Sequence, residues 1–289
     1  MTYLPNEPMI RELLSGMPTT VPEIVKVVQN NIIHIFWAER MGVKLPEKRL
    51  TEVNIRSAAD KLRCIYKHKP VKLTVKRQYT EKLVGNCRDF SVITVAFLRW
   101  AGIPARARCG FGAYFSVPGD KLRYIDHWVV EYWNRDQERW VMVDAQLDNY
   151  QQDVLKLDFD PFDVPSDRFI TGGAAWTMCR EGGADPDAFG IFNMSGMGFI
   201  RGDMIRDLAA LGKIPLLPWD GWGVMLDEEI RHLGFMDRVA RVTVPGTTDY
   251  EEMVELNRHP LLKVPEMIVS WMGGSEPVKV KLSEVTEKM

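Results

Sequence analysis

Apolar residues recur at helical spacing in the first part of the chain. A helix is predicted from Thr20 to Met41: Thr20, Pro22 and Glu23 are start signals, and Gly42 favours its end. Its apolar stripe comprises Val25, Val28, Ile32, Ile33 and Phe36. A second helix is predicted over residues 52–66. Apolar and polar residues alternate in 69–80, which predicts an extended segment.

The next stretch carries the clearest pattern. Residues 87–101 are apolar on at least two sides of a helix, and Gly102 and Pro104 favour a stop directly after them. Strand-like runs follow at 105–111, 127–133 and 139–145. The short polar loop 134–138 joins the last two runs, which predicts an antiparallel hairpin. The order predicts an α+β fold in which a helix packs on an antiparallel sheet.

Beyond residue 149 the chain becomes richer in glycine and acidic residues, with helices predicted over 202–211, 227–240 and 250–257. We divide the chain into N-terminal helices (1–68), a core (69–150) and a C-terminal extension (151–289) packed against the core. The acidic stretch 148–163 lacks regular ligand spacing, which favours a solvated loop over a calcium site. An aromatic set could line a pocket or form plain core: Trp176, Phe189, Phe192, Phe199, Trp219 and Trp222.

Composition excludes several classes of protein. The 289 residues are 46% apolar, which is enough for a sizeable core, and 37 basic residues against 39 acidic ones give no reason to expect nucleic acid or a membrane as partner. The N-terminus shows no signal-peptide pattern. Four cysteines without a C-x-x-C pair predict free thiols, no zinc ribbon and a cytoplasmic, reducing location. We predict no cofactor and no metal.

Three residues could together carry nucleophilic catalysis: Cys87, His127 and Asp144. An ordinary thiol is only about 3% ionised at pH 7, and a mostly ionised one needs roughly 3.4 kcal/mol of stabilisation. A helix N-terminus supplies up to about 2 kcal/mol, so an adjacent imidazolium must supply the rest. His127 and Asp144 are predicted to lie opposite each other in the hairpin, which would let the carboxylate orient the imidazole.

The segments around these residues resemble the transglutaminase-like superfamily. Gly85-Asn86-Cys87, the run from Arg99 to Arg106, His127-Trp128 and Trp140 to Asp144 are similar to its motifs and stand in the same order. The resemblance covers roughly residues 75 to 146. It implies a papain-like core with Cys87 as nucleophile, His127 as base and Asp144 as the group that orients the base.

The function expected from this site is acyl transfer from a small-molecule or peptide amide through a thioester, ended by hydrolysis or by transfer to an amine. Arg106, Arg108 and Trp128 are predicted substrate-binding residues, although both arginines could instead form ion pairs with nearby acidic residues. The second oxyanion donor stays open among Tyr79, Asn86, Trp176, Trp219 and Trp222.

Two rival functions and the oligomeric state also stay open at this stage. One rival is a non-catalytic module that binds a peptide or protein on the same fold. The other, an arylamine acetyltransferase, is disfavoured because its arginine-diglycine run before the cysteine is missing.

Overall fold

A computed structural model of the protein describes residues 1–117, 119–247, 249–272 and 276–285. The N-terminal region is helical: α1 (Pro8–Leu13), α2 (Val21–Asn31), the 3₁₀ helix η1 (Glu47–Asn54) and α3 (Ala58–His68). The prediction of a helix to Met41 is wrong, because the chain leaves α2 at Asn31 and forms β1 (Ile32–His34). The second predicted helix begins later than expected, where the Ser57 side chain accepts the Asp60 N–H.

Residues 69–80, which were predicted to form an extended segment, contain no strand, and the chain turns at 73–74. The 3₁₀ helix η2 (Tyr79–Glu81) is followed by β2 (Leu83–Gly85), which pairs in parallel with β1. The pairing sets His34 opposite Gly85, two residues before Cys87. β1 and β2 thus bring a distant part of the chain beside the start of the next helix.

The predicted apolar helix and hairpin are confirmed. Helix α4 (Cys87–Trp100) is buried over most of its surface and ends before Gly102, whose φ of 79° suits glycine. It packs on β3 (Ala105–Gly112) and β4 (Tyr124–Asn134), and β5 (Arg139–Val143) pairs antiparallel with β4. The six-stranded sheet runs in the order β6-β3-β4-β7-β8, with β5 also on β4. This confirms the predicted α+β class.

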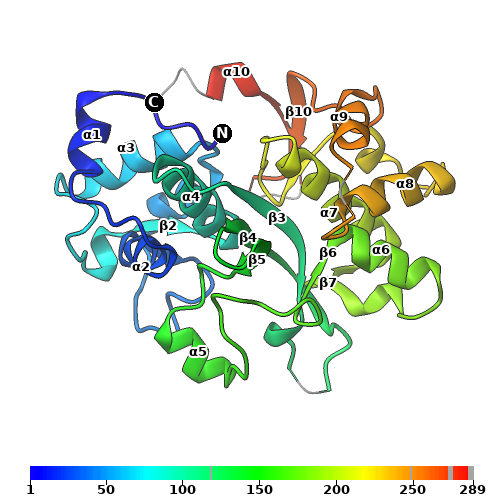
Figure 1. Ribbon diagram of the computed structural model, residues 1–289, viewed down its shortest axis with the longest axis horizontal. Helices are drawn as coiled ribbons and strands as arrows, with labels where there is room; N and C mark the ends of the chain where they lie inside the picture. The colour runs from blue at the N-terminus through cyan, green and yellow to red at the C-terminus, as the bar shows by residue number, and fades with distance from the viewer. Residues whose placement is uncertain (118, 248, 273–275, 286–289) are drawn as a thin grey trace.

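Helices α6 to α9 lie on the side of this sheet away from the N-terminal helices. Figure 1 shows β3 and β4 between the N-terminal helices and the group α6 to α9. The remaining elements are η3 (Ala113–Phe115), α5 (Asn149–Leu155), β6 (Phe169–Thr171), α6 (Gly172–Arg180), η4 (Pro186–Ala188), β7 (Phe189–Ile191), β8 (Met194–Ser195), α7 (Met197–Leu211), β9 (Asp220–Gly221), η5 (Gly223–Leu226), α8 (Leu233–Thr243), α9 (Tyr250–Arg258), β10 (Met267–Ser270), β11 (Val278–Lys281) and α10 (Leu282–Val285).

Two large apolar clusters form the core. One joins α1 to α4 with a face of the sheet and includes Phe90, Trp128 and Val130. The other lies among α6 to α9 and includes Trp176 and Trp222. Helices α6 and α7 of the C-terminal part pack against β3, while the predicted division of the chain at residues 68 and 150 stays a prediction.

Candidate active site

Cys87 is the first residue of α4, the predicted place for a nucleophile. Asn86 caps the helix: its Oδ1 accepts the Asp89 N–H at 3.2 Å, and Asp89 Oδ2 accepts the Asn86 N–H at 3.1 Å. Asp89 is itself held by Lys61, whose Nζ lies 2.7 Å from Oδ1. The cap fixes the backbone on both sides of the thiol, so the position of Cys87 is set by contacts that are themselves buried.

His127 and Asp144 are in direct contact. His127 Nε2 lies 2.7 Å from Asp144 Oδ2, and both side chains are buried. Tyr114 donates its hydroxyl to the same oxygen at 2.7 Å, and the Gln146 N–H donates to Oδ1 at 3.0 Å. Because Nε2 is engaged by the carboxylate, Nδ1 is the ring nitrogen left for a proton from a thiol.

The contact does not arise from direct strand pairing, and the predicted register is wrong. The β4–β5 ladder pairs Val130 with Val143 and stops there, so Asp144 lies beyond its end. Its backbone N–H donates to the Pro161 carbonyl at 2.9 Å. The segment after β5 therefore holds Asp144, and its side chain reaches His127 without being paired opposite it.

The sulfur of Cys87 lies against the strand that carries His127. Burial raises the pKa of Cys87 well above its usual value, and the charges of Asp126 and Asp144 act in the same direction. The backbone N–H groups of Trp128 and Arg88 beside the sulfur oppose this rise. The resting thiol is consequently protonated, and the helix N-terminus alone does not ionise it.

Aromatic rings enclose the imidazole of His127. The ring centroids of Tyr114, Phe115 and Phe169 lie 5.8, 4.7 and 6.3 Å from it, each meeting it edge to face. These residues come from η3 and β6, which flank β3 and β4. The rings limit rotation of the imidazole and exclude water from its hydrogen bond with Asp144.

His34 is a second imidazole at this site that the sequence did not reveal. Burial is the main cause that lowers the pKa of His34 to about 3; the neighbouring His127 contributes in the same direction, and the carboxylate of Asp144 opposes the change. Its Nδ1 accepts the Phe36 N–H at 3.2 Å, so the neutral ring carries its proton on Nε2. Only the parallel pairing of β1 with β2 brings His34 here. No local sequence pattern signals that pairing.

The predicted substrate-binding residues lie on β3 and β4. Arg108 is fully buried and paired with Glu131 and Asp207, with Nη1 2.9 Å from Glu131 Oε2. Arg106 pairs with Glu131 and stacks on Trp140. Trp128 is fully buried in the core. A guanidinium without exposed surface cannot receive a substrate carboxylate, so the alternative of an ion pair describes Arg108 correctly.

The candidates for the second oxyanion-hole donor differ in whether their donor group already has a hydrogen-bond partner. Trp176 Nε1 donates to Asp237 and Trp222 Nε1 to the Leu262 carbonyl, so neither is free. Tyr79 is exposed. Asn86 Nδ2 and Trp219 Nε1 are buried and have no hydrogen-bond partner in the part of the chain that the structure describes. Asn86 adjoins the nucleophile directly.

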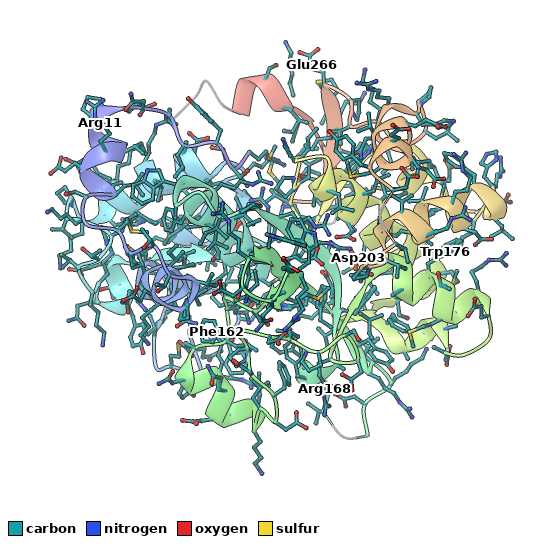
Figure 2. All side chains as sticks on the ribbon, in the orientation of Figure 1. Arg11, Phe162, Arg168, Trp176, Asp203 and Glu266 are labelled. Carbon is teal, nitrogen blue, oxygen red and sulfur yellow. The ribbon has the colours of Figure 1, made fainter. Side chains whose placement is uncertain are left out.

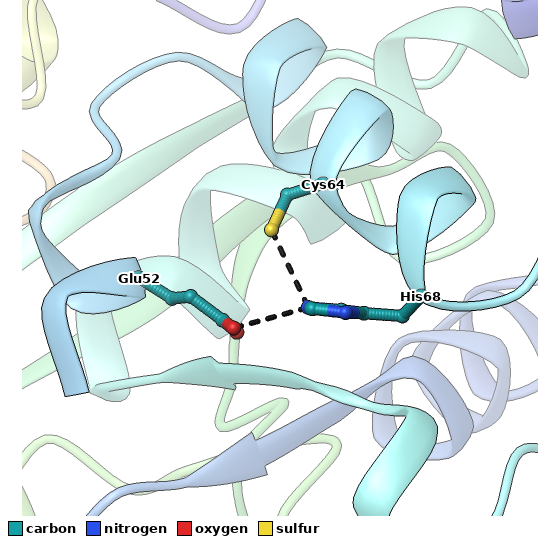
Figure 3. Close-up of side chains that lie close together, drawn as sticks. All are labelled: Glu52, Cys64 and His68. Atoms are coloured by element: carbon teal, nitrogen blue, oxygen red, sulfur yellow. Dashed lines mark hydrogen bonds and ion pairs between the residues drawn. The ribbon is translucent and has the colours of Figure 1, made fainter. Parts of the chain in front are cut away.

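A second group of cysteine, histidine and carboxylate lies on α3 and η1 (Figure 3). His68 Nε2 lies 3.5 Å from Cys64 Sγ and 3.0 Å from Glu52 Oε1. One nitrogen therefore meets both partners, and it cannot accept a thiol proton while it donates to the carboxylate. Arg49 also binds both oxygens of Glu52. This geometry is unsuited to activating a nucleophile.

The acidic stretch 148–163 is explained by local contacts. Asp148 caps α5 by accepting the Gln151 N–H, Asp158 pairs with Arg168, and Asp163 pairs with Arg139. None of its residues belongs to a group of the described side chains arranged to hold a metal ion. Three of its acidic side chains are thus engaged in a helix cap and in surface ion pairs.

The fold and the site define an α+β protein with a cysteine at the start of a core helix, a histidine on the adjoining strand β4 and an aspartate directly after β5. Residues 42–145 match the model of the Transglutaminase-like superfamily, which confirms the resemblance found in the sequence for this part of the chain. The match begins within the predicted N-terminal helical region. The searches of curated proteins and of solved structures returned no match. Within the described residues, every helix is too short or too polar to cross a membrane.

Proposed function

We propose that the protein is a cysteine-dependent acyl-transfer enzyme that acts on an amide or a related carbonyl. The observation that carries the proposal is the buried 2.7 Å contact between His127 and Asp144, made beside the strand segment whose Trp128 N–H meets the Cys87 sulfur. The superfamily match over residues 42–145 supports it.

The first chemical step follows from the free ring nitrogen. As the Cys87 sulfur attacks the carbonyl carbon, its proton passes to His127 Nδ1, and the carbonyl electron pair moves to the oxygen. Asp144 stabilises the imidazolium that forms. Since the resting thiol is protonated, proton transfer accompanies attack.

The oxyanion is stabilised by the backbone N–H of Cys87 and by Asn86 Nδ2. The Cys87 N–H has no partner within α4, because the helix begins at this residue. Asn86 Nδ2 is buried and has no hydrogen-bond partner among the described residues. When the intermediate collapses, the carbon–nitrogen bond breaks, and His127 gives its proton to the leaving amine. A thioester remains on Cys87.

Water or an amine then attacks the thioester and releases the acyl group. His127 accepts a proton from the attacking group, and the thiol is regenerated. The triad is the same for both outcomes, so hydrolysis and amine transfer remain two forms of the proposal. We propose no cofactor for either form.

Intact-protein mass spectrometry with activated acyl esters and thioesters tests the proposal. We expect a mass gain equal to the acyl group, located at Cys87 by peptide mapping. Cys87→Ala and His127→Ala should abolish it, while Cys64→Ser should retain it. Acylation of the other cysteines at the same rate as Cys87 would contradict the proposal.

One observation favours the alternative of a non-catalytic binding module, namely the burial of the thiol and its raised pKa. A binding module would leave Cys87 unmodified by every acyl donor. Its bound peptide would be held without a covalent bond, and Cys87→Ala would still bind it. The two functions are thus separated by whether the adduct is covalent.

A further inference from the structure

A second polar cluster lies inside the protein, outside the Cys–His–Asp group. It consists of Cys109 on β3, Asp126 on β4 and Asp203 on α7, and its sulfur and carboxylate oxygens lie within 4.8 Å of one another. Cys109 and Asp203 are almost wholly buried, and Asp126 is partly buried. Figure 2 shows Asp203 well inside the outline of the molecule, away from Arg11 and Glu266 at its rim.

Strand register and helix packing assemble this cluster. In the β3–β4 ladder Cys109 pairs with Trp128 and Phe111 with Asp126, so Cys109 and Asp126 project from the same face at neighbouring positions. Asp207 on α7 accepts the Cys109 N–H at 2.8 Å. Asp203 lies one helical turn before Asp207, so it faces the same part of β3.

The hydrogen bonds of the cluster are incomplete. Arg206 Nη1 donates to Asp203 Oδ1 at 3.0 Å. Asp203 Oδ2 and Asp126 Oδ1 are buried and have no hydrogen-bond partner among the described residues. The thiol of Cys109, a weak donor, faces the Asp203 carboxylate. Buried acceptors of this kind are rare in folded proteins and call for a ligand or a proton.

We propose that Cys109, Asp126 and Asp203 bind a divalent metal ion of the zinc type. Thiolate and carboxylate oxygen are both ligands of such ions, whereas a thiolate is a poor ligand for calcium or magnesium. Binding forms one metal–sulfur and two metal–oxygen bonds, and the Cys109 proton is released to solvent.

The charges balance when the ion is bound. Two carboxylates and one thiolate supply three negative charges, which the ion and the Arg206 guanidinium neutralise together. Without the ion, the single guanidinium of Arg206 is the cation that faces both carboxyl groups. The enclosure of Cys109 and Asp203 also favours a bare ion over an organic ammonium group, whose carbon atoms would need space.

The group around Glu52 in Figure 3 is a poorer metal site, although its ligand atoms are equally close. Arg49 already pairs with Glu52, at 2.7 Å to Oε1, and its Nη2 lies 3.2 Å from His68 Nε2. The Val84 N–H donates a hydrogen bond to Glu52 Oε2 at 2.8 Å. A cation there would meet a fixed guanidinium and no unpartnered carboxylate oxygen. This group therefore serves as a control.

Cobalt(II) titration of the purified full-length chain tests the inference, because a cobalt–thiolate bond gives a charge-transfer absorption in the near ultraviolet. We expect this band in the wild type and its displacement by zinc. Cys109→Ser should abolish the band, and Asp203→Asn should weaken binding at least tenfold. Cys64→Ser and Cys87→Ala should leave it unchanged.

Three outcomes would overturn the inference. A wild type without the band has no such site. A band lost in Cys64→Ser but kept in Cys109→Ser assigns the metal to the Glu52 group, and a band lost in Cys87→Ala assigns it to the nucleophile. Circular dichroism establishes that each variant is folded. Should Cys109→Ser not fold, Asp203→Asn decides the matter through its metal affinity. Since acylation of Cys87 is not measured, the result is independent of the proposed function.

Discussion

Asp144 shows how one carboxylate can hold the proposed base in place. Its Oδ2 accepts from both His127 and Tyr114, and its Oδ1 accepts from the Gln146 N–H. The Tyr114 hydroxyl therefore fixes the oxygen that meets the imidazole. Hydrogen bonds to a charged group are stronger than those between neutral groups, so the arrangement resists displacement of the ring.

Substitutions at these residues should have graded effects on acylation of Cys87. Asp144→Asn should slow it by about 10²- to 10⁴-fold, because the amide no longer stabilises an imidazolium. Tyr114→Phe should slow it only about threefold to tenfold, because one of three donors is lost. Rates of mass gain with an activated ester measure both. Equal losses in the two variants would show that the carboxylate has no special role.

His34 links the site to the stability of the fold. It is buried and neutral, and the pKa in the folded state, about 3, lies below the usual value of 6.5. The unfolded chain therefore binds a proton between pH 6.5 and pH 3 that the folded chain does not. Stability from this residue is fully present above pH 6.5 and falls as the pH is lowered through that interval.

Removing the His34 imidazole should make the free energy of unfolding depend less on pH in the acidic range. His34 alone accounts for about 2 kcal/mol of stability lost by pH 5. Denaturant unfolding of His34→Phe should show a smaller drop between pH 7.5 and pH 5 than the wild type. The exposed His232→Asn serves as the matched control and should follow the wild type. An unchanged slope in His34→Phe would place the acid sensitivity in other groups.

At the scale of elements, the close approach of the β3 and β6 backbones determines how the sheet is arranged around the site. Gly110 pairs with His127 on β4 and with Thr171 on β6. A Cβ at this position would meet the Ile170 carbonyl oxygen at 2.2 Å, which is backbone and cannot turn aside. Only glycine lets β6, and with it Phe169, lie beside the imidazole.

Adding one methyl group to this strand should therefore be costly. Gly110→Ala should destabilise the protein by about 1–3 kcal/mol or more, because β3 and β6 must separate. Gly198→Ala in α7 is the control: its Cβ would meet nothing within 4 Å. A helical Gly→Ala change of this kind is neutral or stabilising by about 0.5–1 kcal/mol. Urea unfolding of the pair measures the difference, and similar values would refute the close approach.

At the scale of the whole molecule, buried ion pairs join the two apolar clusters. Arg108 on β3 binds Asp207 on α7, with Nε 3.0 Å from Oδ1 and Nη2 2.8 Å from Oδ2. Arg56 binds Asp220 in the same way, at 2.9 and 2.7 Å, and so ties the N-terminal helices to the C-terminal sheet. These pairs make the C-terminal part a structural support of the sheet that carries the site.

Breaking one of these pairs should affect the entire fold. Asp207→Asn should cost about 3–5 kcal/mol, because it weakens the pairing of a wholly buried guanidinium. Asp163→Asn breaks the exposed pair with Arg139 and should cost at most about 1 kcal/mol. Thermal unfolding followed by circular dichroism compares them. A small loss for Asp207→Asn would mean that the two parts are held together by apolar packing alone.

Sequence patterns located the parts of the fold that depend on neighbouring residues. The start of α4 at Cys87, its stop before Gly102 and the β4–β5 hairpin follow from local periodicity and turn residues. The end of α2 was misplaced, because the apolar run through Ile32 and Ile33 suits a buried strand as well as a helix. The ion pair of Arg108 with Glu131 was among the alternatives drawn from the sequence, whereas its second partner, Asp207, lies 99 residues away and has no local signal.

What the sequence determined alone is the order of the proposed nucleophile, base and carboxylate along the chain, and the helix and hairpin beside which they lie. Tertiary structure decided which imidazole nitrogen meets Asp144, that His34 joins the site, and that Cys109, Asp126 and Asp203 gather around one point. The physical reason is that periodicity records which face of an element is buried. Which distant side chains share that interior depends on strand register and helix packing.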